Sequence, residues 1–198
     1  MCRCASPALS FMTPKGRGCM PDSASRLLPD LPIVEGLALQ PPLCRFILRG
    51  NEAALQRASA AFEVDLCGPP LRAAAANDKA GLWLGPDERL LLGPEAQEGG
   101  IAIALAAALA GTPHSLVCVS HRQCGLEVRG KRAIALLNSG CPRDLDIAAF
   151  PVEACARTIF SKAEIVLWRV APEQFHVEVW RSFLDYVVGL LAEAAHDC

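Results

Sequence analysis

The stretch 124–138, CGLEVRGKRAIALLN, joins a strand pattern to a helix pattern and sets the fold class of the chain. In its first part Leu126 and Val128 alternate with charged residues, which is the period of a strand that buries one face. Gly130 allows the chain to turn at low steric cost. The residues after it favour a short helix, closed by the Ser, Gly and Pro within 139–142. We therefore predict a strand, a tight turn and a helix in direct succession.

Hydrophobic periodicity predicts similar elements on both sides of this stretch. Asn51 is the expected N-cap of the first helix. Hairpins interleaved with helices favour an α+β protein with mixed or antiparallel sheets and helices packed on one face. The other predicted elements are a strand at 44–49, a helix at 51–62, a hairpin of 80–84 and 89–92, a helix from 94 to about 110, strands at 115–120, 155–161, 163–170 and 174–180, and a last helix from 182.

The first 42 residues differ in composition from the rest. They hold seven of the 15 prolines and three of the ten cysteines, and show neither a period of 2 nor one of 3.6. We expect residues 1–42 to be an irregular N-terminal arm, disordered or docked on a partner, and residues 43–198 to form the α+β domain. Two small subdomains with a break near 113–115 are compatible with the pattern.

Bulk composition excludes several classes of protein. The net charge of -2 and the absence of a basic cluster argue against nucleic-acid binding. The longest apolar run, residues 101–110, is half the roughly 20 residues that a membrane span needs, so we expect a buried helix and no membrane. Without a secretory signal we expect a cytoplasmic protein, in which the cysteines are reduced and serve as small apolar residues.

The search for catalytic motifs assigns no catalytic, cofactor-binding or metal-binding residue. The chain has no glycine-rich dinucleotide or phosphate fingerprint. Cys118, His121 and Cys124 have a spacing that suggests zinc, but no second close pair completes four ligands. Core thiols and a histidine in a turn are the favoured interpretation. A Cys–His nucleophile pair stays open, and a zinc- or thiol-based enzyme ranks last among the hypotheses.

A partner interface is the sharper interpretation of one group of residues. Trp and Arg are enriched where proteins meet, and Trp180 with Arg181 pairs the two types at the end of an apolar strand. In that strand His176 and Glu178 are expected to point outward, away from the core. We assign Trp180, Arg181 and Arg157 as candidate interface residues.

Three stretches together resemble one family: LWLGPDERLLL at 82–92, SHRQCGLEVRGKRAIALLNSGC at 120–141, and CARTIFSKAEIVLWRV with FHVEVWRSFLDYVVGLLAEAA within 155–195. From about residue 81 to residue 195 their order and spacing are similar to the gamma subunit of heterotetrameric sarcosine oxidase. The second stretch also resembles the folate-binding aminomethyltransferase superfamily, whose strand-to-helix pattern Ser120, Gly125, Val128 and Gly130 fill approximately.

The resemblance implies an aminomethyltransferase folate-binding-domain-like fold and a set of partners. By this likeness the chain is a non-catalytic gamma subunit, inactive alone, that packs mainly on alpha beside beta and delta subunits. The complex oxidatively demethylates sarcosine to glycine and passes the one-carbon unit to tetrahydrofolate or formaldehyde. FAD, FMN, NAD, tetrahydrofolate and zinc are expected on the partner subunits. The alternative is a stand-alone folate-binding one-carbon transferase or iron–sulfur assembly factor of the same fold.

Overall fold

The computed structural model describes residues 35–197, which contain two five-stranded antiparallel sheets. The first sheet has the strand order β3-β4-β5-β2-β6. Its strands are β2 (Leu43–Gly50), β3 (Ala73–Ala76), β4 (Lys79–Trp83), β5 (Glu88–Pro94) and β6 (His114–Cys118). Its helices are α1 (Glu52–Phe62) and α2 (Glu98–Ala108), the latter preceded by the short 3-10 helix η2 (Glu95–Gln97).

The second sheet has the strand order β1-β7-β10-β9-β8. Its strands are β1 (Leu37–Leu39), β7 (Gln123–Arg129), β8 (Cys155–Phe160), β9 (Ala163–Ala171) and β10 (Gln174–Trp180). It carries α3 (Ala133–Asn138), the 3-10 helix η3 (Arg181–Phe183) and α4 (Leu184–Asp197). The α+β fold class with antiparallel sheets is confirmed.

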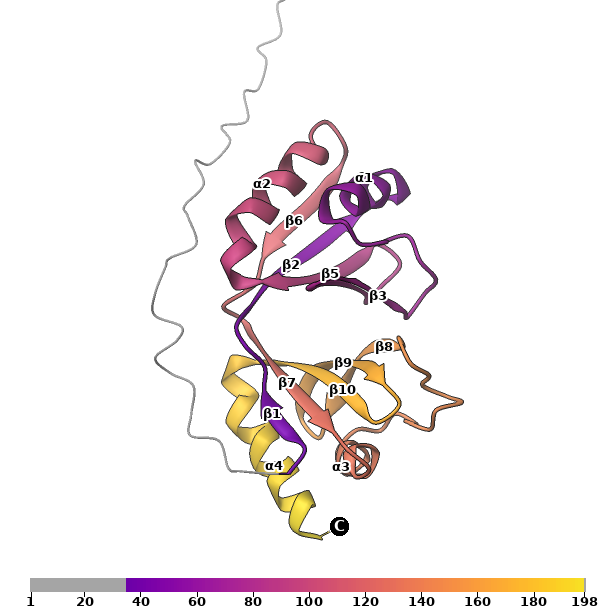
Figure 1. The fold of residues 1–198 in the computed structure, drawn as a ribbon, viewed down its shortest axis with the longest axis vertical. Helices are drawn as coiled ribbons and strands as arrows, with labels where there is room; N and C mark the ends of the chain where they lie inside the picture. Colours follow the sequence, from indigo (N-terminus) through magenta and orange to yellow (C-terminus); the bar gives the residue numbers. More distant parts are fainter. Residues whose placement is uncertain (1–34, 198) are drawn as a thin grey trace, which may run out of the picture.

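The elements stack in four layers, helices–sheet–sheet–helices. Figure 1 shows α1 and α2 outside the first sheet, α3 and α4 outside the second, and the two sheets facing each other. Each sheet buries one apolar cluster against its helices, around Phe46 and Leu105 in the first and around Leu126 and Phe175 in the second. A third cluster lies between the sheets and comprises Ala73, Ala80, Leu82, Leu90, Leu92, Cys155 and Val166. Both faces of each sheet are therefore covered.

The strand-turn-helix stretch folds as its sequence predicts. Leu126 and Val128 are fully buried on β7, and Gly130 turns the chain with φ +99°, in the left-handed region that favours glycine. The chain then enters α3, which buries Ala133, Leu136 and Leu137 against the same sheet. The β4–β5 hairpin is also confirmed, with Ala80 opposite Leu92 and Leu82 opposite Leu90.

Two features of the structure bear on the expected domain organisation. The predicted irregular arm, residues 1–42, includes a strand, because Leu37–Leu39 pairs antiparallel with β7; residues 1–34 lie outside the described part. Near the expected break at 113–115, β6 begins at His114 and pairs with β2 of the first sheet. The chain passes to the second sheet between β6 and β7.

The Ala-rich helix α2 is less buried than its composition suggests. Ile101 and Leu105 pack on the first sheet, whereas Ile103 is 73% exposed. The expectation of a buried helix therefore holds for one face only. None of the helices within residues 35–197 is both long and apolar enough to cross a membrane.

We expect the N-cap of α1 to contribute measurably to stability. The Asn51 side chain accepts a hydrogen bond from the Ala54 amide at 3.0 Å. Asn51→Ala removes this acceptor and should lower the free energy of unfolding by about 1 kcal/mol, whereas Asn51→Asp keeps it. Urea denaturation of the full chain measures both; equal stability of the two variants would show that the cap contributes nothing.

Candidate functional site

A buried charge network links the two sheets across the interior of the sandwich. Arg45 on β2 of the first sheet donates two hydrogen bonds to Glu178 on β10 of the second, Nε to Oε2 at 2.6 Å and Nη2 to Oε1 at 3.0 Å. Its Nη1 donates to the Leu43 carbonyl at 2.8 Å. Arg45 is 3% exposed and Glu178 is fully buried. A bidentate pair of this kind is among the stronger polar contacts in proteins.

His176 completes this network from the same strand as Glu178. Its Nε2 donates to Glu178 Oε1 at 2.7 Å, and its ring lies 5.9 Å from the Trp168 ring. Burial by itself raises the pKa of Glu178, but the hydrogen bond from His176 and the charge of Arg45 outweigh it and hold that pKa below its ordinary value. Glu178 is therefore a carboxylate at neutral pH.

The network needs a residue without a side chain on the neighbouring strand. A Cβ atom at Gly125 on β7 would lie 3.0 Å from His176 Cε1 and 3.3 Å from Glu178 Oε1. Gly125, one of the residues that carry the family resemblance, thus leaves room for the buried histidine and carboxylate.

A second ionic contact ties the sheets near the edge. Glu88 on β5 accepts hydrogen bonds from Arg49 on β2 and from Arg157 on β8 of the opposite sheet. Burial raises the pKa of Glu88, yet the hydrogen bonds and charges of Arg157 and Arg49 together lower it. The carboxylate is thus fully engaged within the chain.

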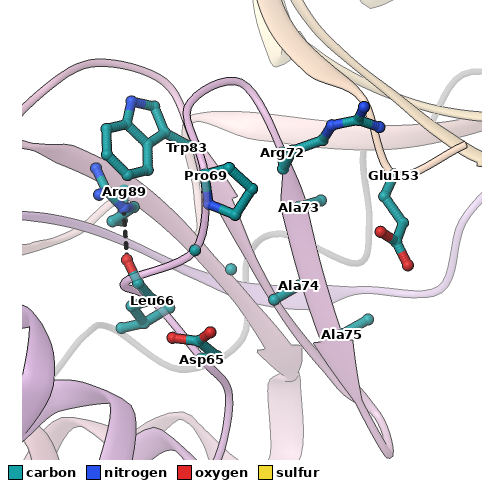
Figure 2. A pocket seen from close by; sticks show the side chains of 12 residues that line it. Asp65, Leu66, Pro69, Arg72, Ala73, Ala74, Ala75, Trp83, Arg89 and Glu153 are labelled. Carbon is teal, nitrogen blue, oxygen red and sulfur yellow. Dashed lines mark hydrogen bonds between the residues drawn. The ribbon is translucent and has the colours of Figure 1, made fainter. Parts of the chain in front are cut away.

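A cavity of about 310 Å³ lies beside β3, on the side of the loop that follows α1 (Figure 2). Arg89 and Trp83 stand at one side of it and Glu153 at the other. The Arg89 Cζ atom lies 3.4 Å from the centre of the Trp83 ring, and Arg89 Nε donates to the Leu66 carbonyl at 2.9 Å. The lining residues are Asp65, Leu66, Gly68, Pro69, Arg72, Ala73, Ala74, Ala75, Gly81, Trp83, Arg89 and Glu153.

The chemistry of this cavity is limited by its lining. It contains neither Cys, His, Ser, Thr, Tyr nor Lys, so it offers no hydroxyl, thiol or amine nucleophile. Burial lowers the pKa of Arg89, whose Nη2 has no hydrogen-bond partner among the described residues. That nitrogen has almost no accessible surface, so a ligand in the cavity does not reach it in this conformation. The charged groups that remain at the cavity are the exposed carboxylates of Asp65 and Glu153 and the half-buried guanidinium of Arg72, which donates to the Val152 carbonyl at 2.8 Å.

The three candidate interface residues do not form one group. Trp180 ends β10 and is 37% exposed, with the guanidinium of Arg122 5.1 Å from its ring centre. Arg181 follows directly and donates its Nε to the His121 carbonyl at 3.2 Å. Arg157 lies two strands away on β8 and bonds Glu88 across the sheets. Trp180 and Arg181 remain together at the surface, whereas Arg157 has an intramolecular role.

The candidate metal and thiol residues differ in their exposure. Cys118 is exposed on edge strand β6 and Cys124 is buried on β7. Among residues 35–197, no three His, Cys, Asp or Glu side chains converge where they could hold a metal ion. The six cysteines described, Cys44, Cys67, Cys118, Cys124, Cys141 and Cys155, are free thiols.

The outward placement of His176 and Glu178 is wrong, and so sequence reasoning missed the buried network. The strand alternation itself is correct, because Phe175, Val177 and Val179 pack against α4 and its neighbours. The opposite face meets the other sheet instead of water. An Arg within the apolar strand CRFILR was the one available sign that a buried carboxylate faces it.

Comparisons with known proteins agree on one family. A family model described as "Sarcosine oxidase, gamma subunit family" matches residues 50–197. A relative from an Arthrobacter species, "Sarcosine oxidase subunit gamma", is 36% identical over 122 residues, which cover 62% of this chain and 59% of that protein. The alignment thus spans little more than half the length of this curated relative.

Two solved structures are similar to this chain in fold. A chain of the heterotetrameric sarcosine oxidase from Corynebacterium sp. U-96 in complex with pyrrole 2-carboxylate has a TM-score of 0.75 at 26% identity, over 81% of this chain and 83% of that chain. Aminomethyltransferase T of the glycine cleavage system from Bartonella henselae has a TM-score of 0.61 at 11% identity, over 82% and 49%. The second likeness is one of fold alone.

Removing the carboxylate of Glu178 should destabilise the chain strongly. Glu178→Gln leaves the buried Arg45 charge uncompensated, and we expect a loss of about 3 kcal/mol in the free energy of unfolding. Because the folded pKa of Glu178 is lowered, its contribution is present above the unfolded pKa and is lost as pH falls below it. Stability of the wild type should therefore fall more steeply below about pH 4.5 than that of the variant. Exposed Glu193→Gln is the control, and a similar loss there would contradict the interpretation.

Thiol labelling should separate the cysteines by burial. Burial raises the pKa of Cys155 to about 11, and burial together with the charges of Glu98 and Cys118 raises that of Cys44 to about 11. With iodoacetamide at pH 8 the exposed Cys67 should react, while Cys44 and Cys155 should stay unmodified until urea unfolds the chain. Peptide mass spectrometry measures the rates, and equal rates in the folded protein would refute the placement.

Proposed function

Because the chain belongs to the sarcosine oxidase gamma subunit family, we propose that it is the gamma subunit of a heterotetrameric sarcosine oxidase complex. It packs mainly on the alpha subunit, beside beta and delta. The complex oxidatively demethylates sarcosine to glycine, with the one-carbon unit passing to tetrahydrofolate or formaldehyde. This chain contributes structure to that assembly and no catalytic group.

The observation that supports a non-catalytic role is that the buried charged side chains are paired with one another. Arg45, Glu178 and His176 bond to one another across the sandwich, and Glu88 bonds to two arginines. Catalytic groups need access to substrate in a cavity. The described cavity is lined by none of these side chains. Glu88 and Glu178, the two buried carboxylates with lowered pKa values, thus serve to join the two sheets.

The cofactors of the complex are proposed to lie on the partner subunits. FAD, FMN and NAD need a site for their phosphates, and the chain has no glycine-rich fingerprint that would cradle them. The cavity of about 310 Å³ is at the lower end of small-molecule sites, and its buried arginine is covered. Within residues 35–197 no ligand cluster suits zinc. The similarity in fold to aminomethyltransferase T does not by itself imply a tetrahydrofolate site.

Expression with and without the other subunits tests this proposal. The full chain alone should show no flavin absorbance and should not oxidise sarcosine. Co-expressed with tagged alpha, beta and delta subunits, it should co-purify in one assembly that absorbs as a flavoprotein and oxidises sarcosine. A solitary chain that binds tetrahydrofolate at micromolar concentration and transfers a one-carbon unit would favour the stand-alone alternative and overturn the proposal.

A further inference from the structure

The exposed aromatic side chains of the described structure are gathered in one short segment. Trp180, Phe183 and Tyr186 are 37%, 40% and 38% exposed. No other Trp, Phe or Tyr within residues 35–197 is exposed. They lie where β10 ends and passes through η3 into α4. We call these three residues, with the adjoining Arg122 and Arg181, the aromatic patch.

Contacts within the chain hold the aromatic patch in place. The Phe183 and Tyr186 rings meet edge to face with centres 6.5 Å apart, and the Tyr186 hydroxyl lies 2.9 Å from the Ser161 hydroxyl. Between these exposed residues Leu184, the first residue of α4, is buried in the apolar cluster of the second sheet. The side chains are thus fixed on rigid elements, which lowers the entropy that binding would cost.

Two cations flank the rings. The Arg122 guanidinium lies 5.1 Å from the Trp180 ring centre, and the Arg181 amide donates to the Arg122 carbonyl at 2.8 Å. Among the ion pairs of residues 35–197, none involves Arg122 or Arg181. Asp185 is the nearby carboxylate in sequence, and it lies in the first turn of α4, where negative charge stabilises the helix. The two arginines therefore leave positive charge at the border of the rings.

We propose that the aromatic patch is the surface by which this chain binds another subunit, and that the occupant is an apolar protein surface bordered by carboxylates. Trp, Tyr and Arg are the residue types that contribute most at interfaces. The positive border selects a negatively charged counterpart and speeds association. This inference rests on the proposed function, since the occupant is a partner subunit of the same assembly.

Binding of variants to the tagged alpha subunit, within the co-expressed complex, tests the proposal. The triple variant Trp180→Ala/Phe183→Ala/Tyr186→Ala should weaken association at least thirtyfold, which corresponds to about 2 kcal/mol of binding free energy. Arg122→Glu/Arg181→Glu should slow association severalfold and reduce its dependence on salt. Ile147→Ala, which removes another exposed apolar side chain (47%), is the matched control and should bind as the wild type does.

The outcomes separate this inference from the proposed function. If the wild-type chain joins no complex, the proposed function fails and this inference with it. If the wild type joins and both variants bind as tightly, with unfolding midpoints equal to that of the wild type, only the aromatic patch is refuted. Should the triple variant unfold, the charge-reversal variant, which alters the exposed Arg122 and the half-buried Arg181 and leaves the apolar core intact, still decides the question.

Discussion

The contact between Arg45 and Glu178 fixes how the two halves of the molecule face each other. Each half is a sheet with its own helices and its own apolar cluster, while the cluster between the sheets is small. A buried guanidinium and a buried carboxylate must meet, because either one left alone in the interior carries a large desolvation penalty. Both bonds of the pair require β2 and β10 to lie where the two side chains reach each other. Its role is therefore specificity of packing more than net stability.

Other features of the interior follow from this contact. Gly125 leaves space for the His176 ring. His176 donates to Glu178 Oε1, and this hydrogen bond helps to keep the carboxylate charged. Arg157 and Glu88 form a second ion pair between the two sheets, nearer the edge of the sandwich. These polar groups are occupied by one another within the chain. The aromatic patch, in contrast, presents exposed side chains at the surface.

Local sequence was sufficient for most elements but not for the interior. The strand-turn-helix at 124–138 and the N-cap Asn51 are set by neighbours within a few residues, and the structure confirms them. Two strands could not be predicted from the sequence. β3 is a run of four alanines without a hydrophobic period, and β1 is a three-residue strand that is defined by its pairing with β7. Glu178 was misplaced because alternation shows that a strand has two faces without showing what covers the second. The bond from Arg157 to Glu88 could not be read from the sequence, because the two residues lie 69 positions apart.

A double-mutant cycle between Arg45 and Glu178 tests the central claim most directly. Arg45→Met and Glu178→Leu, each alone, should lower the free energy of unfolding of the full chain by about 3 kcal/mol, because each leaves one buried charge without its partner. The double variant replaces the pair by apolar groups and should cost much less than the sum, with a coupling of at least about 1.5 kcal/mol. Losses that simply add would mean that the two charges do not depend on each other, and would contradict the claim that this pair joins the sheets.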